Sequence, residues 1–154
     1  MLFRSGLSRV DIAVINGRIH GYEIKSEEDT LKRLPNQIKY YNKSLEKITV
    51  AVNEIHFSKI LEVIPNWWGI LVIENDLAIN IARNAQENPL IEGTSLLELL
   101  WSNELRSIAA KYNIKSKLNS PKRILREQLI KELTLFQISY EVRDTLKLRQ
   151  NWRT

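Results

Sequence analysis

Apolar and polar residues alternate most clearly near the N-terminus, in residues 10–15 and again in residues 18–26. A strand with one buried face shows this period of two, because successive side chains point to opposite faces. The two runs flank Asn16-Gly17, the dipeptide most typical of a tight turn between antiparallel strands. The pattern therefore predicts a β-hairpin over residues 10–26.

The register of this hairpin decides which side chains share a face. Pairing across a two-residue turn places Asp11 and Glu23 on opposite faces of the hairpin. One extra residue in the second strand, a bulge at Gly21-Tyr22, would bring Asp11 opposite Glu23. Because glycine inside a strand often marks a bulge, the sequence predicts a bulge at this position.

The chain continues with segments of helical and strand-like pattern. Pro35 suits the first position of a helix, and a second helix is expected over residues 57–64. Continuous apolar runs at residues 48–52 and 70–74 predict central strands, and alternation at residues 77–83 predicts an edge strand. The order of hairpin, helix, strand, helix and hairpin indicates an α/β fold, with a mixed β-sheet flanked by helices.

The remainder of the chain has a helical pattern. Residues 85–94 are polar and are predicted to form a linker. This linker separates an α/β core over residues 1–84 from a helical subdomain over residues 95–154. Helices within the subdomain are expected over residues 95–112, 121–133 and 139–152.

The net charge of +5 is distributed unevenly along the 154 residues. Residues 101–154 contain 12 lysines and arginines against 5 aspartates and glutamates, whereas the first 100 residues contain 11 against 13. A basic half of this kind suits a polyanionic partner, most naturally DNA. A solvated basic surface would explain the charge equally well.

The composition also excludes some classes of protein. The chain has no cysteine, so a disulfide framework and a cysteine-ligated zinc site are both ruled out. It has no apolar run long enough to span a membrane, and we expect a cytoplasmic protein without a membrane partner. A second copy of the chain is a further candidate partner.

Charged residues inside the predicted hairpin indicate a candidate site. Asp, Glu and Lys are not favoured in strands, yet Asp11, Glu23 and Lys25 all lie there. Glu23 and Lys25 are two residues apart and share a face. Two carboxylates and a lysine suit phosphodiester hydrolysis with Mg²⁺ or Mn²⁺, because carboxylate oxygens bind these hard cations. A structural ion pair between Glu23 and Lys25 is the alternative.

Asp11, Glu23-Ile24-Lys25, Gln37 and Tyr41 together resemble the pattern of the PD-(D/E)XK nuclease superfamily. More narrowly, these residues and Trp67-Trp68-Gly69 look like a small family of uncharacterised bacterial proteins within that superfamily. The resemblance implies a restriction-endonuclease-like core. Only ten residues precede Asp11, so this core would be short at its N-terminus.

The resemblance also assigns roles to particular residues. Asp11 and Glu23 would bind the metal together with the backbone carbonyl of Ile24. Lys25 would position the attacking water, and Gln37 would maintain the geometry of this catalytic group. The helical region similarly resembles DNA-binding modules of the SAP type. The residues expected to contact nucleic acid are Arg9, Arg33, Tyr41, Lys115, Lys117, Lys122, Arg123 and Arg126.

These observations predict a metal-dependent deoxyribonuclease of the PD-(D/E)XK type. The alternative is a non-catalytic nucleic-acid-binding protein on the same fold, with a site left incomplete by the short N-terminal part. A third hypothesis is an interaction module whose basic tail binds a protein or a second copy of the chain. Salt-sensitive DNA binding without cleavage would favour the second of these hypotheses.

Overall fold

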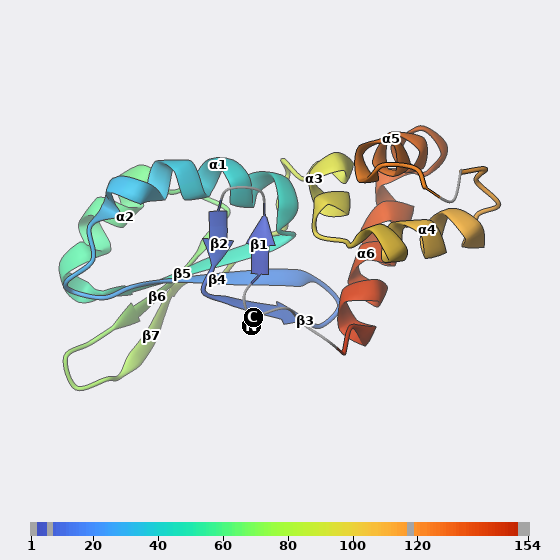
Figure 1. The fold of residues 1–154 in the computed structure, drawn as a ribbon. Coiled ribbons are helices and arrows are strands. Elements are labelled where there is room, and N and C mark those ends of the chain that lie inside the picture. Colours follow the sequence, from blue (N-terminus) through green and yellow to red (C-terminus); the bar gives the residue numbers. More distant parts are fainter. Residues whose placement is uncertain (1–2, 6–7, 117–118, 151–154) are drawn as a thin grey trace.

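The computed structural model describes residues 3–5, 8–116 and 119–150. Its first two strands, β1 (Phe3–Ser5) and β2 (Ser8–Val10), pair with each other as a small antiparallel sheet. The hydrophobic pattern did not predict this sheet, because each strand has only three residues. The β1–β2 sheet lies beside the first long helix in Figure 1.

The main sheet has five strands in the spatial order β3-β4-β5-β6-β7. The central strands β4, β5 and β6 are parallel, and both outer strands run antiparallel to their neighbours. This arrangement confirms the predicted α/β class and its mixed sheet (Figure 1). The strands are β3 (Ile12–Ile15), β4 (Ile19–Lys25), β5 (Lys47–Asn53), β6 (Gly69–Ile73) and β7 (Ile79–Arg83).

The predicted bulge at Gly21-Tyr22 is wrong. Strands β3 and β4 pair without interruption, from Ile12 opposite Tyr22 to Ile15 opposite Ile19. The register shift comes from the turn, which has three residues between the paired ends, with Gly17 at a φ of 69°. Glycine adopts this left-handed conformation without a steric penalty. One extra residue in the turn changes the register by the same amount as one extra residue in the strand.

Two helices and their leading 3₁₀ turns cover one face of the main sheet (Figure 1). Helix α1 (Leu34–Ser44) follows the turn η1 (Leu31–Arg33), and helix α2 (Phe57–Val63) follows the turn η2 (Glu54–His56). Both helices lie where the sequence predicted them. The core between the helices and the sheet consists of fully buried aliphatic and aromatic side chains, among them Ile19, Leu34, Tyr41, Ile48, Val50, Val52, Ile60, Trp68 and Ile70.

The C-terminal part contains helices α3 (Gly93–Glu98), α4 (Ser102–Lys111), α5 (Lys122–Glu132) and α6 (Leu135–Leu148). The single helix predicted over residues 95–112 is therefore two helices. The helix is interrupted before α4, where the backbone N–H of Trp101 donates to the Glu104 carboxylate at 2.6 Å. Helix α6 begins four residues earlier than predicted, because Thr134 caps it together with Gln137. None of the described helices is long and apolar enough to cross a membrane.

Residues 85–94, predicted to be a linker, are packed against the sheet domain. The buried side-chain amide of Asn88 donates to the backbone oxygens of Asn42 and Leu45, both at 2.7 Å. The backbone N–H of Glu92 donates to the oxygen of Lys43 at 2.9 Å. One hydrophobic cluster extends from the sheet into the C-terminal helices. The sheet and the helices are thus joined by a continuous core.

The half-buried His20 on β4 predicts a pH dependence of stability. Its Nε2 lies 2.8 Å from Thr49 Oγ1, and burial lowers the pKa of His20 below 6.5. The unfolded chain therefore binds a proton more readily, so stability is kept above pH 6.5 and falls as the pH drops below it. Thermal unfolding from about pH 8 to about pH 5 should show a smaller decrease for His20→Gln than for the wild type. An unchanged decrease would contradict this role of His20.

Candidate functional site

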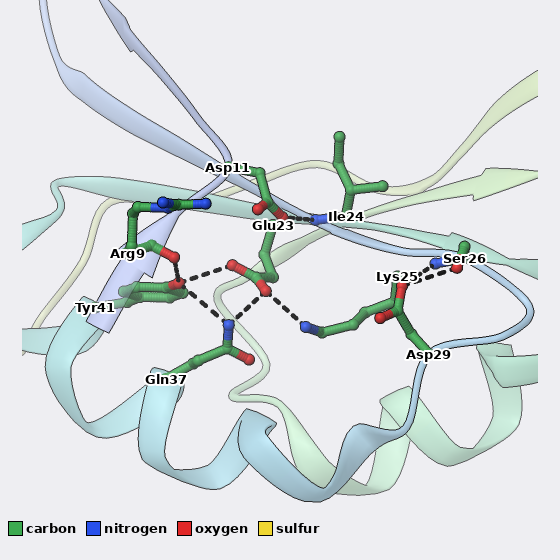
Figure 2. A network of polar contacts seen from close by, with 9 residues as sticks. All are labelled: Arg9, Asp11, Glu23, Ile24, Lys25, Ser26, Asp29, Gln37 and Tyr41. Carbon is green, nitrogen blue, oxygen red and sulfur yellow. Dashed lines mark hydrogen bonds and ion pairs between the residues drawn. The ribbon is translucent and has the colours of Figure 1, made fainter. Parts of the chain in front are cut away.

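The Glu23 carboxylate is the centre of a buried polar network (Figure 2). Its Oε1 accepts hydrogen bonds from Lys25 Nζ at 2.6 Å and from Gln37 Nε2 at 2.5 Å. The hydroxyl of Tyr41 lies 2.7 Å from Glu23 Oε2 and also 2.7 Å from the backbone oxygen of Arg9. Both oxygens of this carboxylate are therefore engaged by protein donors.

The local geometry of two elements brings these four side chains together. Glu23 and Lys25 are two residues apart on β4, so both point toward the helix-covered face, as their spacing predicted. Gln37 and Tyr41 are four residues apart on α1 and lie on the helix face that packs against β4. The alternation of the strand and the period of the helix thus position the network.

The ion pair between Glu23 and Lys25 is unusually well buried. The side chains are 2% and 3% exposed, so both charges are removed from water. An ion pair in this environment is held by its mutual attraction and by further hydrogen bonds, here from Gln37 and Tyr41. The geometry matches the structural alternative for these two residues, in a buried rather than an exposed setting.

Asp11 lies outside this network. Its side chain is exposed, and its Oδ2 accepts a hydrogen bond from the backbone N–H of Ile24 at 2.8 Å (Figure 2). Asp11 therefore connects the segment before β3 to β4 through the N–H of Ile24. The predicted metal ligand at Ile24 was its carbonyl and not its N–H. Within the described residues, no three Asp, Glu or His side chains are grouped as a metal site. Binding of Mg²⁺ or Mn²⁺ by Asp11, Glu23 and the Ile24 carbonyl stays a prediction.

Asp29 is a polar residue at this end of the sheet that the sequence reasoning did not single out. Its Oδ2 accepts hydrogen bonds at 2.9 Å from both the backbone N–H and the hydroxyl of Ser26. The backbone hydrogen bond is the main cause of the lowered pKa of Asp29, and the hydroxyl bond adds to it. Ser26 and Asp29 are three residues apart, and this spacing is a recognisable turn signal. The contact closes the loop after β4.

The residues expected to contact nucleic acid fall into three groups. Arg9 on β2 and Arg33 at the end of η1 are exposed near the buried network. Tyr41, also expected to contact nucleic acid, is fully buried and has no surface to offer a ligand. The remaining described residues, Lys115, Lys122, Arg123 and Arg126, lie in the α4–α5 loop and at the start of α5, and Lys117 lies outside the described residues.

Several cations at the start of α5 have only weak acidic partners. Arg123 pairs with Glu127 on the surface, and the guanidinium of Arg126 lies 3.7 Å from the carboxylate of Glu98. Lys122 donates to the backbone oxygen of Glu98 at 3.3 Å, and burial lowers the pKa of this lysine. Exposed ion pairs contribute little stability, so an anionic ligand can compete for these cations.

A hollow of about 750 Å³ opens at the N-terminus of α5, lined by Lys115 but not by Lys122, Arg123 or Arg126. Helix α5 begins at the edge of the hollow, and no side chain of the described residues caps the first turn of this helix. The buried Oε1 of Gln128 also has no hydrogen-bond partner among the described residues. The hollow therefore presents a lysine, hydroxyl and amide groups, and the positive end of a helix. Its lining residues are Lys115, Ser116, Asn119, Ser120, Pro121, Ile124 and Gln128.

Comparison with known proteins gives one consistent family. The family model described as Bacteriophage P4 protein cII matches residues 4–153. Protein cII of Enterobacteria phage P4 is 27% identical over 144 residues, which are 92% of this chain and 54% of that protein. The chain thus spans about half the length of the curated relative that it matches. No solved structure matches it.

These comparisons overturn the resemblance to the PD-(D/E)XK superfamily. The matching family covers almost the whole chain, and no PD-(D/E)XK nuclease family matches. The identification as a member of that superfamily is therefore wrong, and so is the predicted function as a nuclease or phosphodiester hydrolase, which rested on it. The same four residues, Glu23, Lys25, Gln37 and Tyr41, form the polar network described above.

Proposed function

Because the chain belongs to the family of bacteriophage P4 protein cII, whose model matches residues 4–153, we propose that it is a non-catalytic DNA-binding protein. The single observation that carries this proposal is the concentration of positive charge in the C-terminal helices. Residues 101–154 contain 12 lysines and arginines against 5 aspartates and glutamates. The protein would act in the cytoplasm, where its DNA would be accessible.

The start of α5 is the proposed contact surface. Lys115 lines the hollow, and Lys122, Arg123 and Arg126 are within the first five residues of α5, which begins there. Phosphate groups are bound well by such cations and by the free N–H groups of a helix N-terminus. Contacts of this kind give affinity for the DNA backbone without selecting a sequence.

The polar network around Glu23 has a structural role in this proposal. Its hydrogen bonds join β4 to α1, and the hydroxyl of Tyr41 also reaches the backbone of Arg9 on β2. The network thereby positions the N-terminal sheet against the first helix. Two observations support this role: the network is buried, and protein donors occupy both carboxylate oxygens.

Salt-dependent binding of a labelled duplex tests the proposal. Fluorescence anisotropy should show binding at about 50 mM salt that weakens by two orders of magnitude or more at about 200 mM. Replacing both Lys115 and Arg123 by glutamine should lower the slope of log K against log salt by about 2, because each phosphate contact contributes about 1. Both side chains are exposed, so the fold should be kept.

Lys39 and Lys59 provide the matched control. Both are exposed on α1 and α2, and replacing them by glutamine changes the net charge by the same amount. This control variant should keep the wild-type slope. An equal loss in the two variants, or no binding at low salt, would overturn the proposed surface. Cleavage of the duplex in magnesium that disappears in Asp11→Ala, a change of an exposed side chain, would overturn the non-catalytic role.

A further inference from the structure

The main sheet has a second face, opposite α1 and α2 (Figure 1). The pairing registers place side chains from every strand on this face, because paired residues point to the same side. We call it the open face. Its large aliphatic members are Ile12 and Val14 on β3, Ile24 on β4, Leu71 and Ile73 on β6, and Ile79 and Ile81 on β7.

Five of these side chains are more than two-fifths exposed, and four of the five are on the edge strands β3 and β7. Ile12, Val14 and Ile24 are 48%, 45% and 41% exposed, and Ile79 and Ile81 are 63% and 66% exposed. Single exposed aliphatic residues are common on proteins, but several on the same face of one sheet are typical of an interaction surface. The open face is therefore a candidate interaction surface.

The chemistry of the open face suits a second copy of itself. In a twofold interface each copy presents the same surface, so a face with unpaired charges of one sign would repel its copy. The ionisable side chains of this face are few: Tyr22, His20 with its lowered pKa, and Lys47. Lys47 lies at the end of β5 and is 3.5 Å from Glu87. A second copy would thus meet aliphatic groups without like charges.

The area of the open face limits how strongly two copies could associate. Five strands spaced by about 4.8 Å, each contributing about five residues of 3.3 Å, cover roughly 400 Å². Two such faces would bury about 800 Å² together, and the surrounding loops add to this, for example through Leu77, 80% exposed in the β6–β7 turn. This total is below the roughly 1,200 Å² of stable specific interfaces and is closer to that of weak, transient ones. It is sufficient for a weak, concentration-dependent dimer.

We propose that the chain forms a twofold-symmetric homodimer in which the open faces of two copies pack against each other. The two sheets would then lie about 10 Å apart, as in other face-to-face sheet packings. Helix α6 contacts β3 and would border the interface at one edge. The proposal goes beyond DNA binding, because the association needs no nucleic acid.

Sedimentation velocity of the 154-residue chain tests this dimer without DNA. Between about 1 and about 200 μM, the average mass should rise from 18.0 kDa toward twice that value, with a dissociation constant on the order of 10 μM. Ile81→Lys should weaken the dimer by at least tenfold, because it places like charges in an apolar interface. A monomer at every concentration would overturn the proposal.

Leu61 provides the matched control for the open face. It is 47% exposed on α2, on the opposite side of the sheet. Leu61→Lys should therefore keep the wild-type dissociation constant, and circular dichroism should show that both variants are folded. A dimer that Ile81→Lys and Leu61→Lys weaken equally, or that neither weakens, would place the interface elsewhere and overturn the proposal.

Cross-linking gives a second test that does not depend on a destabilising charge. The chain has no cysteine of its own, so one introduced thiol is unique. Ile24→Cys lies next to the central strand of the open face, and a short bifunctional maleimide should link two copies through it. Leu61→Cys should give at least tenfold less linked dimer at the same concentration. Equal yields for the two variants would overturn the proposed face.

Discussion

Replacing Lys25 by methionine should lower the free energy of unfolding by about 3–5 kcal/mol. The Glu23 carboxylate would then remain buried without its ammonium partner, and the hydrogen bonds from Gln37 and Tyr41 compensate only part of its charge. For a chain of this length the thermal midpoint should fall by roughly 6–20 °C. Differential scanning calorimetry at neutral pH measures this change.

Two further variants separate the charge from the loss of side-chain packing. Lys39→Met removes an exposed lysine from α1 and should change stability by less than about 0.5 kcal/mol. Combining Glu23→Gln with Lys25→Met removes both charges and should recover part of the lost stability, because no uncompensated buried charge remains. A double variant less stable than Lys25→Met would contradict the role of the ion pair.

Replacing Glu46 by leucine should destabilise the protein by about 3–5 kcal/mol as well. The Glu46 carboxylate is buried, accepts a hydrogen bond from the backbone N–H of Ile19 at 2.8 Å, and pairs with Arg143 on α6. Leucine would leave both donors without a partner. The loss should be visible as a lower urea midpoint by tryptophan fluorescence, with an unchanged slope.

Glu92 is the matched control for this second variant. Its carboxylate pairs with Lys43 at 2.9 Å, but both side chains are more than two-fifths exposed. Glu92→Leu should therefore cost less than about 1 kcal/mol. If both glutamate variants were equally stable, the contact between Glu46 and Arg143 would not join α6 to the sheet in solution.

The hairpin shows how far sequence patterning can predict this fold. Alternation and Asn16-Gly17 correctly predicted two antiparallel strands, because both signals act over a few residues. The pattern also indicated that the register must shift by one residue, but it placed the extra residue at Gly21. A shift in the turn and a shift in the strand align the same side chains, so the pattern cannot distinguish them.

The candidate site was predicted as a set of residues but not as a function. The spacing of Glu23 and Lys25, and that of Gln37 and Tyr41, follows from strand and helix geometry. A carboxylate with a lysine and an amide can bind a metal or can form a buried structural network. Which of these applies depends on burial and on the direction of each hydrogen bond, and local spacing contains neither.

The open face could not be predicted for a related reason. Residues 10–15 contain aliphatic side chains on both sides of the strand, so alternation alone does not show which side a helix will cover. That choice depends on how α1 and α2 return to the sheet, which is a long-range property of the chain. The basic character of the C-terminal helices, in contrast, is a matter of composition and was visible from the start.

The packed connection over residues 85–94 would fix the geometry of the proposed DNA contacts. A joint held by Asn88 and Glu92 resists bending, so the start of α5 keeps a constant position relative to the sheet. In a dimer joined through its sheets, the two basic ends would then be a fixed distance apart. A duplex too short to span that distance would contact only one of the two ends, whatever its sequence. Binding would then depend on the length of the duplex and not on its base sequence.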